Sequence, residues 1–172
     1  HREIRRLNPI AMPYPPGIEP LDLPQWTNRH GNFTQPLRAG ASFKLFNLDL
    51  PSRTASYNAT TANMRWLIGE AQRGRFRLRA LGRGWSFSKV NVSEGGLLDT
   101  MDLRLSFNLT DAFVDPAFLA RGRRSQDLML VQCGMSVAML NDRLERAGEE
   151  RRMLRASGAA HGQSIVGAFS TN

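Results

Sequence analysis

The chain has 172 residues and a formal net charge of +8, and 41% of its residues are hydrophobic while 22% are charged. These values are close to those of an ordinary globular protein that has one core. No uninterrupted apolar run reaches the roughly 18 residues of a membrane span. The single cysteine, Cys133, excludes an intramolecular disulfide framework and is expected to be a buried, unreactive thiol.

The positive charge makes nucleic-acid binding a function to consider. Apart from Lys44 and Lys89, all 23 basic residues are arginines. They are scattered along the chain, often beside acidic residues, as in "NDRLERAGEERRMLR". Because a nucleic-acid-binding protein more often gathers its basic residues in a stripe or tail, nucleic acid is an unlikely partner, and the arginines are expected to contact anions at particular places.

Prolines are concentrated at the beginning of the chain, where eight of the nine lie within residues 1–51. Proline lacks a backbone donor and fixes φ, so this stretch cannot form a continuous helix or a central strand. We therefore predict that residues 1–41 form an irregular, proline-rich arm on the domain surface, anchored by Trp26 and Phe33.

Regular structure is predicted after Gly40. The segment "SFKLFNLDLP" predicts a strand with Phe43 and Leu45 inward. The segment "NATTANMRWLIGEAQRG" predicts a helix capped by Thr60 or Thr61 and ended by Gly74. The apolar residues expected on its inner face are Met64, Leu67, Ile68 and Ala71. In "RFRLRAL", the alternation of Phe76, Leu78 and Ala80 with arginines predicts a half-buried strand.

The second half of the chain predicts further strands and a second helix. A turn and one or two short strands are expected in "GGLLDTMDLRLSFNLT", and a buried strand in "DLMLVQCG". In "SVAMLNDRLERAG", Ser136 is expected to cap a helix whose inward residues are Val137, Leu140, Leu144 and Ala147. This order of elements predicts a mixed α+β domain and not a regular doubly wound sheet.

A first glycine-rich loop, "GRGWSFS" at residues 82–88, follows a predicted strand. Its glycines allow backbone N–H groups to converge on an anion such as pyrophosphate, and Ser86 and Ser88 add hydroxyl donors. A tight turn with no ligand is the alternative. The loop is neither a P-loop nor the dinucleotide fingerprint G-x-G-x-x-G, because position 87 is Phe and a strand is expected next.

A second glycine-rich stretch, "SGAAHGQSIVGAFSTN", covers residues 157–172. It is poor in large side chains and rich in hydroxyl and amide donors, which suits the wrapping of a flat polar ligand. A flexible terminal segment is the alternative, although "SIVGAF" is apolar for such a segment. His161 either contacts the ligand or is a packed or exposed histidine.

The two loops carry a resemblance to a known family. "RALGRGWSFS" resembles the first phosphate loop of the vanillyl-alcohol-oxidase-type flavoproteins, whose FAD-binding domain is called the PCMH type and usually has Gly-x-x-His-Ser after an apolar strand. "SGAAHGQSIVGAFSTN" is similar to their second FAD loop, in which Ser/Thr-Ile/Val-x-Gly-Ala follows small residues. The segments "TANMRWLIGEAQRG" and "LVQCG" match in order and spacing, so the resemblance covers about residues 45–172.

The resemblance implies an α+β, PCMH-type domain of mixed sheets and flanking helices that binds FAD between the two loops. It further implies oxidation of a CH–OH group, on a sugar, polyol, aldonolactone or sterol, by hydride transfer to the flavin, which oxygen or another acceptor reoxidises. No metal site is expected, and no catalytic base is assigned. The expected FAD-binding residues are Gly82, Arg83, Gly84, Trp85, Ser86, Phe87, Ser88, Ser157, Gly158, His161, Gly162, Gln163, Ser164, Gly167, Ala168, Ser170 and Asn172.

The chain departs from this family pattern in two ways. Trp85 stands where many relatives carry a histidine bonded covalently to the flavin, so FAD is expected to be non-covalent. Relatives also continue well beyond the equivalent of Asn172. Residues 42–172 are therefore expected to be the N-terminal portion of an FAD-binding domain, with the remainder and a substrate domain on a second polypeptide.

Two other functions remain open from the residues alone. One is a basic module that binds an anion or nucleic acid without redox chemistry, and the other is a nicotinamide-dependent reductase of the same flavin superfamily. A cytoplasmic location is expected, although Asn-X-Ser/Thr sequons at Asn32, Asn58, Asn91 and Asn108 leave secretion open.

Overall fold

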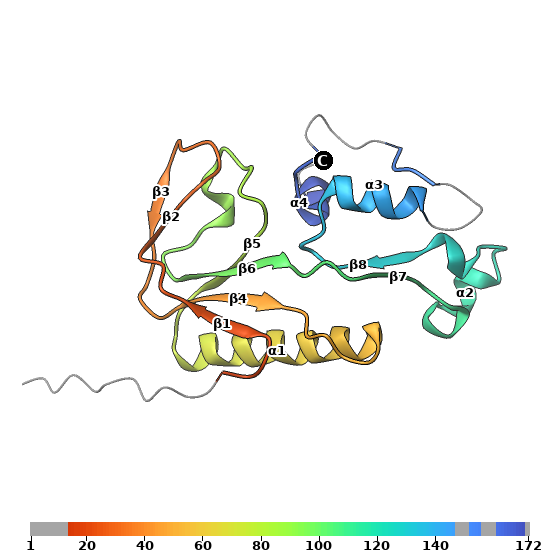
Figure 1. The fold of residues 1–172 in the computed structure, drawn as a ribbon, viewed down its shortest axis with the longest axis horizontal. Helices are drawn as coiled ribbons and strands as arrows, with labels where there is room; N and C mark the ends of the chain where they lie inside the picture. The colour runs from red at the N-terminus through yellow and green to blue at the C-terminus, as the bar shows by residue number, and fades with distance from the viewer. Residues whose placement is uncertain (1–13, 147–151, 156–160, 171–172) are drawn as a thin grey trace, which may run out of the picture.

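The computed structural model describes residues 14–146, 152–155 and 161–170 (Figure 1). The strands are β1 (Ile18–Leu21), β2 (Gln25–Thr27), β3 (Thr34–Pro36), β4 (Ser42–Phe46), β5 (Leu78–Leu81), β6 (Gly96–Asp102), β7 (Ser106–Asn108) and β8 (Met129–Val131). The helices are α1 (Arg53–Arg73), α2 (Pro116–Leu119), α3 (Val137–Glu145) and α4 (Ile165–Ser170). Short 3-10 turns occur at Lys89–Asn91, Asp111–Phe113 and Ser125–Asp127. The chain is thus mixed α+β, as predicted from the order of elements. Across the described ranges, no helix combines the length and the hydrophobicity that crossing a bilayer requires.

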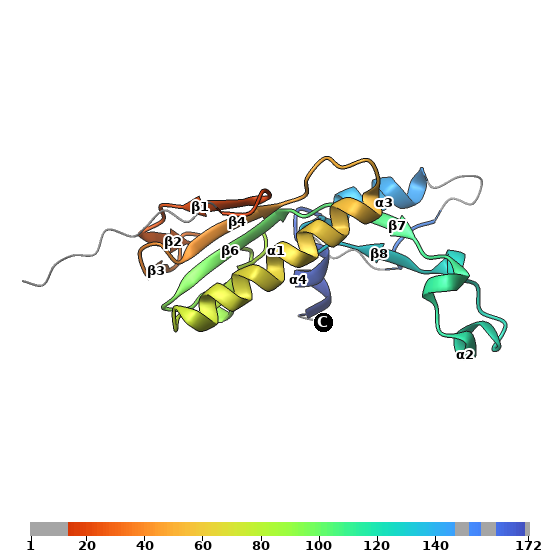
Figure 2. The same ribbon diagram turned by 90° about the horizontal axis from the view of Figure 1, so that it is seen from below.

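A four-stranded mixed sheet with the order β1-β4-β6-β5 forms the centre of the fold. Strands β4, β6 and β5 are parallel, and β1 pairs antiparallel with β4 at the edge. Helix α1 connects β4 to β5 and covers one face of the sheet (Figure 2). Successive residues of a strand point to opposite faces, and Leu98 of β6 therefore packs with Leu67 of α1, whereas Leu97 packs on the other face.

Helix α1 begins earlier than the sequence predicted. Its N-cap is Ser52, whose side chain accepts a hydrogen bond from the N–H of Ala55 at 3.0 Å, so the prediction of a cap at Thr60 or Thr61 was wrong. The prediction of Gly74 as the C-terminal cap is confirmed. The first turns of α1 after Ser52 are polar and show no apolar periodicity. A prediction based on the apolar residues alone therefore placed the start of the helix too late.

The inner face of α1 is also more polar than predicted. Its buried residues are Ser56, Thr60, Asn63, Leu67 and Ala71, and Met64 packs against the same cluster. Ile68 is 49% exposed, so its predicted place on this face was wrong. Adjacent helical residues point about 100° apart, and the helix that buries Leu67 turns Ile68 toward solvent.

The proline-rich N-terminal region contains strands and is not irregular between residues 18 and 36. Strand β1, with Pro20, pairs with β4 at the sheet edge, and β2 and β3 form an antiparallel hairpin. Proline is tolerated at both places because they are edge strands. Trp26 and Phe33 pack against the cluster of Leu81, Val92 and Leu97, which confirms their prediction as anchors.

The remaining strands and α3 form a second, smaller unit beside the sheet. Strands β7 and β8 pair antiparallel, and a reciprocal side-chain hydrogen bond between Asn47 and Gln132 ties them to the end of β4. The predicted Ser136 cap of α3 is confirmed by its bond from the N–H of Met139 at 3.2 Å. Val137 and Leu140 are buried as predicted, Leu144 packs against their cluster, and Ala147 lies outside the described residues.

Some predicted burials were too deep. Strand β8 and Cys133 are half-buried, and Ala80 is exposed on β5.

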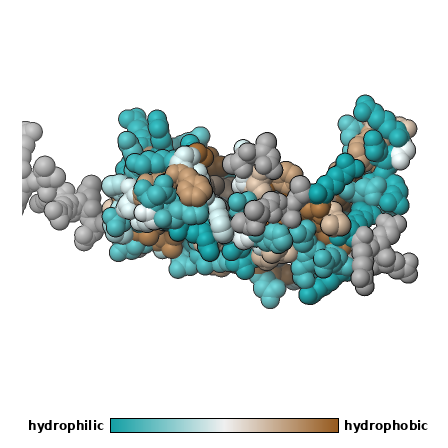
Figure 3. All heavy atoms as spheres, turned by 90° about the horizontal axis from the view of Figure 1, so that it is seen from above, coloured by the Kyte–Doolittle hydropathy of each residue, from teal (hydrophilic) through white to brown (hydrophobic). Residues whose placement is uncertain are grey.

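The surface seen from above is mostly hydrophilic, and its hydrophobic atoms form separate patches (Figure 3). Phe87 and Phe169, which are 70% and 69% exposed, are among the exposed apolar side chains.

Candidate functional site

The first loop (residues 82–88) follows the end of β5 and contains a glycine whose backbone φ lies in the left-handed region. Gly84 has φ +67°, and a Cβ at this position would lie 2.9 Å from Cζ2 of Trp26. Both the backbone angle and the close contact favour glycine here. Strand β6 follows the loop as predicted, although the 3-10 turn at Lys89–Asn91 comes between them.

The second loop is described over residues 161–170, and it is held against the start of α3 by backbone hydrogen bonds. The N–H of Ile165 donates to the carbonyl of Met135 at 2.8 Å. In return, the N–H groups of Val137 and Ala138 donate to the carbonyls of Gln163 and His161, each at 3.0 Å. The apolar part of this loop, for which no helix was predicted, forms α4, and Ile165 packs into the same cluster as Val137. Residues 161–170 are therefore a docked element and not a flexible tail.

The two loops meet at glycines. A Cβ on Gly82 would lie 2.8 Å from Oγ of Ser164, and a Cβ on Gly162 would lie 3.2 Å from Cζ2 of Trp85. Glycine at these two positions allows the loops to approach more closely than any other residue would permit. Ser164 is buried, and its Oγ also accepts the N–H of Gly167 at 3.3 Å, so the contact with Gly82 lies at the first turn of α4.

A pocket of about 310 Å³ lies between the two loops, and we call it the loop pocket. It is lined by Gly82, Arg83, Gly84, Trp85, Ser86, Ser88, Val90, Gln163, Ser164, Gly167 and Ser170. All of these except Val90 were predicted as FAD-binding residues. Val90 was missed because an apolar residue after the loop carries no donor and no motif marks it.

The other predicted site residues lie elsewhere. Phe87 is exposed and stacks on His30, with ring centroids 4.0 Å apart. Gly162 contacts the Trp85 ring, and Ala168 packs into the α3–α4 cluster. The exposed His161 contributes its carbonyl to the start of α3. Ser157, Gly158 and Asn172 lie outside the described residues.

The chemistry of the loop pocket suits an anion. Among the described residues that line it, Arg83 is the only charged one and none is a carboxylate. Within the described part of the chain, the buried Nε of Arg83 and Nε1 of Trp85 have no hydrogen-bond partner. A buried donor that is left unpaired costs about 1–3 kcal/mol, so a ligand that accepts these hydrogen bonds would be favoured.

The size of the loop pocket points to part of a ligand and not to a whole dinucleotide. Ligand pockets usually enclose roughly 300–1,000 Å³, and the loop pocket is at the small end of this range. A pyrophosphate with an adjoining sugar is the portion of FAD that such a pocket can hold. The lining chemistry and the glycine contacts therefore fit the central part of the implied cofactor.

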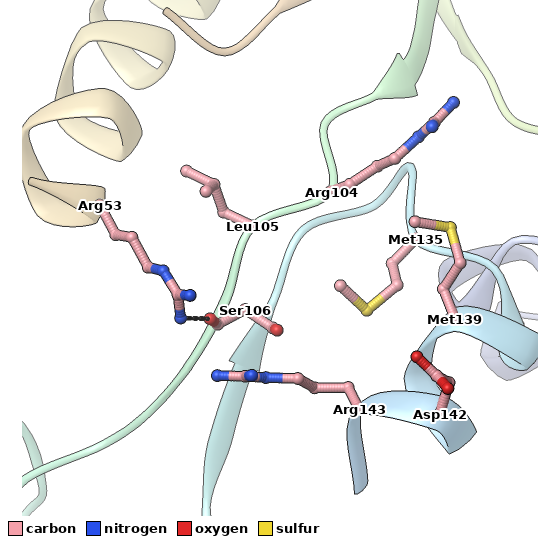
Figure 4. A pocket seen from close by; sticks show the side chains of 8 residues that line it. All are labelled: Arg53, Arg104, Leu105, Ser106, Met135, Met139, Asp142 and Arg143. Atoms are coloured by element: carbon pink, nitrogen blue, oxygen red, sulfur yellow. Dashed lines mark hydrogen bonds between the residues drawn. The ribbon is translucent and has the colours of Figure 1, made fainter. Parts of the chain in front are cut away.

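A second pocket, of about 300 Å³, lies between the start of α1, β7 and α3 (Figure 4). In Figure 4, the guanidinium groups of Arg53 and Arg143 both extend toward Ser106, and Arg53 donates to the Ser106 carbonyl at 3.3 Å. Asp142 is paired with Arg146 at 2.7 Å. The pocket is basic, but Arg53 and Arg143 are exposed, and none of its described lining residues has a buried side-chain polar atom that lacks a hydrogen-bond partner.

The clearest ionisation shifts lie outside both pockets. Lys44 and Asp102 form an ion pair at 2.7 Å, and this contact lowers the pKa of Asp102 and raises the pKa of Lys44. Hydrogen bonding to Arg124 lowers the pKa of Asp127 in the same way. Among the described residues, no three His, Cys, Asp or Glu side chains gather in a group that would hold a metal ion.

Comparisons with protein-family models, with curated proteins and with solved structures found no match to this chain.

Proposed function

We propose that this chain belongs to the FAD-binding domain of an FAD-dependent oxidoreductase that acts on CH–OH groups. The observation that carries the proposal is the loop pocket. Two glycine-rich segments, far apart in the sequence and each similar to an FAD loop, come together around one cavity. A tight turn at residues 82–88 with no ligand would not require the second segment to be there.

In this proposal, the loop pocket holds the FAD pyrophosphate. Arg83 supplies positive charge, and Ser164 lies on the walls of the pocket together with Ser86 and Ser88, whose hydroxyl oxygens lie 3.1 Å apart. Gly82, Gly84 and Gly167 let the ligand approach the backbone closely. Charge-assisted hydrogen bonds of this kind are about twice as strong as neutral ones, which makes Arg83 the leading affinity determinant.

When bound, FAD supplies the redox chemistry by accepting a hydride from the CH–OH carbon of the substrate, and oxygen or another acceptor then reoxidises it. The residues of this chain bind and orient the cofactor. We propose a sugar, polyol, aldonolactone or sterol as the substrate class, because the motifs most resemble that branch of the family.

We propose that the FAD is not covalently bound. Trp85 stands at the position of the flavin-linking histidine, and an indole ring cannot form that bond. The ring also has two close neighbours, because the Arg29 guanidinium lies 4.5 Å from its centroid and a Cβ on Gly162 would lie 3.2 Å from its Cζ2 atom. Trp85 would therefore act as a wall of the pocket and hold the two loops in place.

The test is a titration of the full chain with FAD, in which the change in flavin fluorescence measures binding. We expect saturable binding that inorganic pyrophosphate competes away, and acid precipitation should release all of the flavin. Arg83→Met should weaken binding by about tenfold or more, the loss of one charge-assisted hydrogen bond. Arg53→Met, which removes an arginine from the second pocket, is the matched control and should bind FAD normally.

The outcomes separate the alternative functions. Flavin that remains in the acid precipitate would refute the argument from Trp85. Binding of pyrophosphate without FAD, or binding of an oligonucleotide that weakens steeply with salt, would instead favour an anion-binding or nucleic-acid-binding module. If the flavin-loaded protein consumed NADPH, and did not consume oxygen with a carbinol substrate, it would be a reductase.

A further inference from the structure

We propose that the turn at residues 28–32, which joins β2 to β3, is a positioning device that sets the shape of the first loop for anion binding. This inference rests on the proposed function and identifies the residues that prepare that site. No sequence motif pointed to the turn, because the region was predicted to be an irregular arm.

The turn binds four successive carbonyl groups of the first loop. The backbone N–H of Arg29 donates to the carbonyl of Gly84, and Nε2 of His30 donates to the carbonyl of Trp85, each at 3.1 Å. The side-chain Nδ2 of Asn28 donates to the carbonyl of Ser86 at 3.0 Å, and Nδ2 of Asn32 donates to the carbonyl of Phe87 at 2.9 Å. A carbonyl only accepts, so the Nε2 atom of His30 carries the proton. The hairpin and the first loop lie side by side in Figure 1.

These four bonds determine where the N–H groups of the loop point. In a trans peptide the C=O and the following N–H lie on opposite sides, so a carbonyl turned toward the hairpin turns the next N–H away from it. Within the described residues, the N–H groups of residues 85–87 donate no hydrogen bond. They are left free to donate to an anion, as in a backbone nest.

Asn28 is the centre of this arrangement and is only 3% exposed. Its Oδ1 closes the turn by accepting the N–H of Asn32 at 3.1 Å, and its Nδ2 bridges to Oδ1 of Asn32 at 2.5 Å and to the carbonyl of Ser86. The side chain thus both shapes the turn and holds the loop. Residues locked by such a supporting network are the ones that keep a binding site in its productive geometry.

Contacts of aromatic rings also hold the first loop against the turn at residues 28–32. The guanidinium of Arg29 lies over the Trp85 ring, and His30 stacks on Phe87 with an interplanar angle of 12°. The hairpin is itself fixed, because Trp26 and Phe33 pack against the core cluster of Leu81. The loop is therefore supported from one side by a rigid element, and its other side is open to the pocket.

The experiment uses the full chain, labelled with ¹⁵N and titrated with inorganic pyrophosphate. In the unmodified protein we expect the amide signals of residues 85–87 to shift on binding. Asn28→Asp keeps the oxygen that closes the turn but replaces the donor to Ser86 with a carboxylate. We expect these shifts to disappear and the pyrophosphate affinity to fall by about tenfold or more, since a positioning bond becomes a repulsion.

Two further variants separate positioning from folding and from charge. Asn32→Asp removes the donor to the Phe87 carbonyl at an exposed site. It therefore provides a second measurement of pyrophosphate affinity and amide shifts if Asn28→Asp fails to fold. Gln35→Glu is the matched control, because it makes the same charge change on the same hairpin, but the Gln35 side chain donates to the carbonyl of Pro36 and not to the first loop. It should leave both the affinity and the amide shifts unchanged.

A pH measurement adds a readout that lost stability would not give. When the new carboxyl of Asn28→Asp is protonated, it can donate to Ser86 again, so the affinity of the variant relative to the unmodified protein should recover as the pH falls. Normal affinity and normal amide shifts in both aspartate variants would overturn the positioning role. If the unmodified protein bound neither pyrophosphate nor FAD, the proposed function itself would fail.

Discussion

Gly82 and Ser164 lie in contact, so closely that a Cβ on Gly82 would be 2.8 Å from the Ser164 hydroxyl oxygen. This contact joins the end of β5 to the first turn of α4, and the loop pocket lies beside it. The side chain of Ser164 is buried and is held by the N–H of Gly167, so it cannot easily rotate away. The distance between the two loops is therefore set by the absence of a side chain at residue 82.

Gly82→Ala tests this contact. The added methyl group should push Ser164 and α4 away from the first loop and weaken the binding of FAD or pyrophosphate by about fivefold to 150-fold, which corresponds to an overpacking strain of about 1–3 kcal/mol. Fluorescence titration measures the affinity. Gly69→Ala in α1 is the control, because its Cβ would be 3.4 Å from the flexible end of Arg73, and it should leave binding unchanged. Equal affinity in both variants would show that the loops can separate without consequence.

The face that α1 turns to the sheet is tested by two neighbouring apolar residues. Leu67 is fully buried, whereas Ile68 is 49% exposed. Leu67→Ala should lower the free energy of unfolding by about 2–5 kcal/mol through the cavity it leaves. Ile68→Ala should change the free energy by about 0.5 kcal/mol or less, as at most surface positions. Urea denaturation compares the two, and a larger loss for Ile68→Ala would place the helix in a different rotation.

The start of α1 gives a similar comparison. Ser52→Ala removes the side-chain acceptor of the Ala55 N–H and should cost about 1 kcal/mol of stability. Thr61 is inside the helix, where its hydroxyl donates back to the carbonyl of Tyr57, so Thr61→Ala should be neutral or slightly stabilising. Thermal or urea unfolding of both variants measures this difference. The reverse order would place the cap where the sequence alone suggested it.

The Lys44–Asp102 ion pair predicts how stability depends on pH. The pKa of Asp102 lies below its ordinary 3.8, so its contribution is complete above that value and is lost as the pH falls through the lowered pKa. The pKa of Lys44 lies above its ordinary 10.5, so its contribution is complete below that value and is lost as the pH rises through the raised pKa.

Asp102→Asn removes this contribution. Both side chains are about one-third exposed and screened by water, so the variant should be less stable by only about 0.2–1 kcal/mol at neutral pH. The difference between the two proteins, measured by urea unfolding at several pH values, should shrink in strong acid and in strong base. A difference that stayed constant below pH 3.8 would mean that the ion pair does not form.

Local patterns in the sequence were sufficient for many elements. Alternation identified β4, a serine before an apolar period identified the start of α3, and glycine at position 74 identified the end of α1. In each case a few neighbouring residues carry the physical cause, either side-chain direction or a hydrogen bond to the nearby backbone. The two glycine-rich loops were also visible as candidate anion-binding segments, for the same local reason.

Other features depend on residues that are distant in the sequence. The polar inner face of α1 is buried because Thr60 and Asn63 find partners in Asn47 and Pro16. Pro20 belongs to an edge strand because β4 is available to pair with β1. Neither partner can be deduced from the segment itself, and propensity alone therefore predicted the wrong face and an irregular arm.

The sequence by itself determined which residues of the two loops are able to bind an anion, since glycine and serine carry that capacity wherever they lie. Only the tertiary structure decided that the loops share one pocket and that the turn at residues 28–32 supports one of them. The physical reason is that a pocket is formed by packing between separate elements. Here α3 positions Ser164, β5 positions Gly82, and the β2–β3 hairpin holds the carbonyl groups of the first loop.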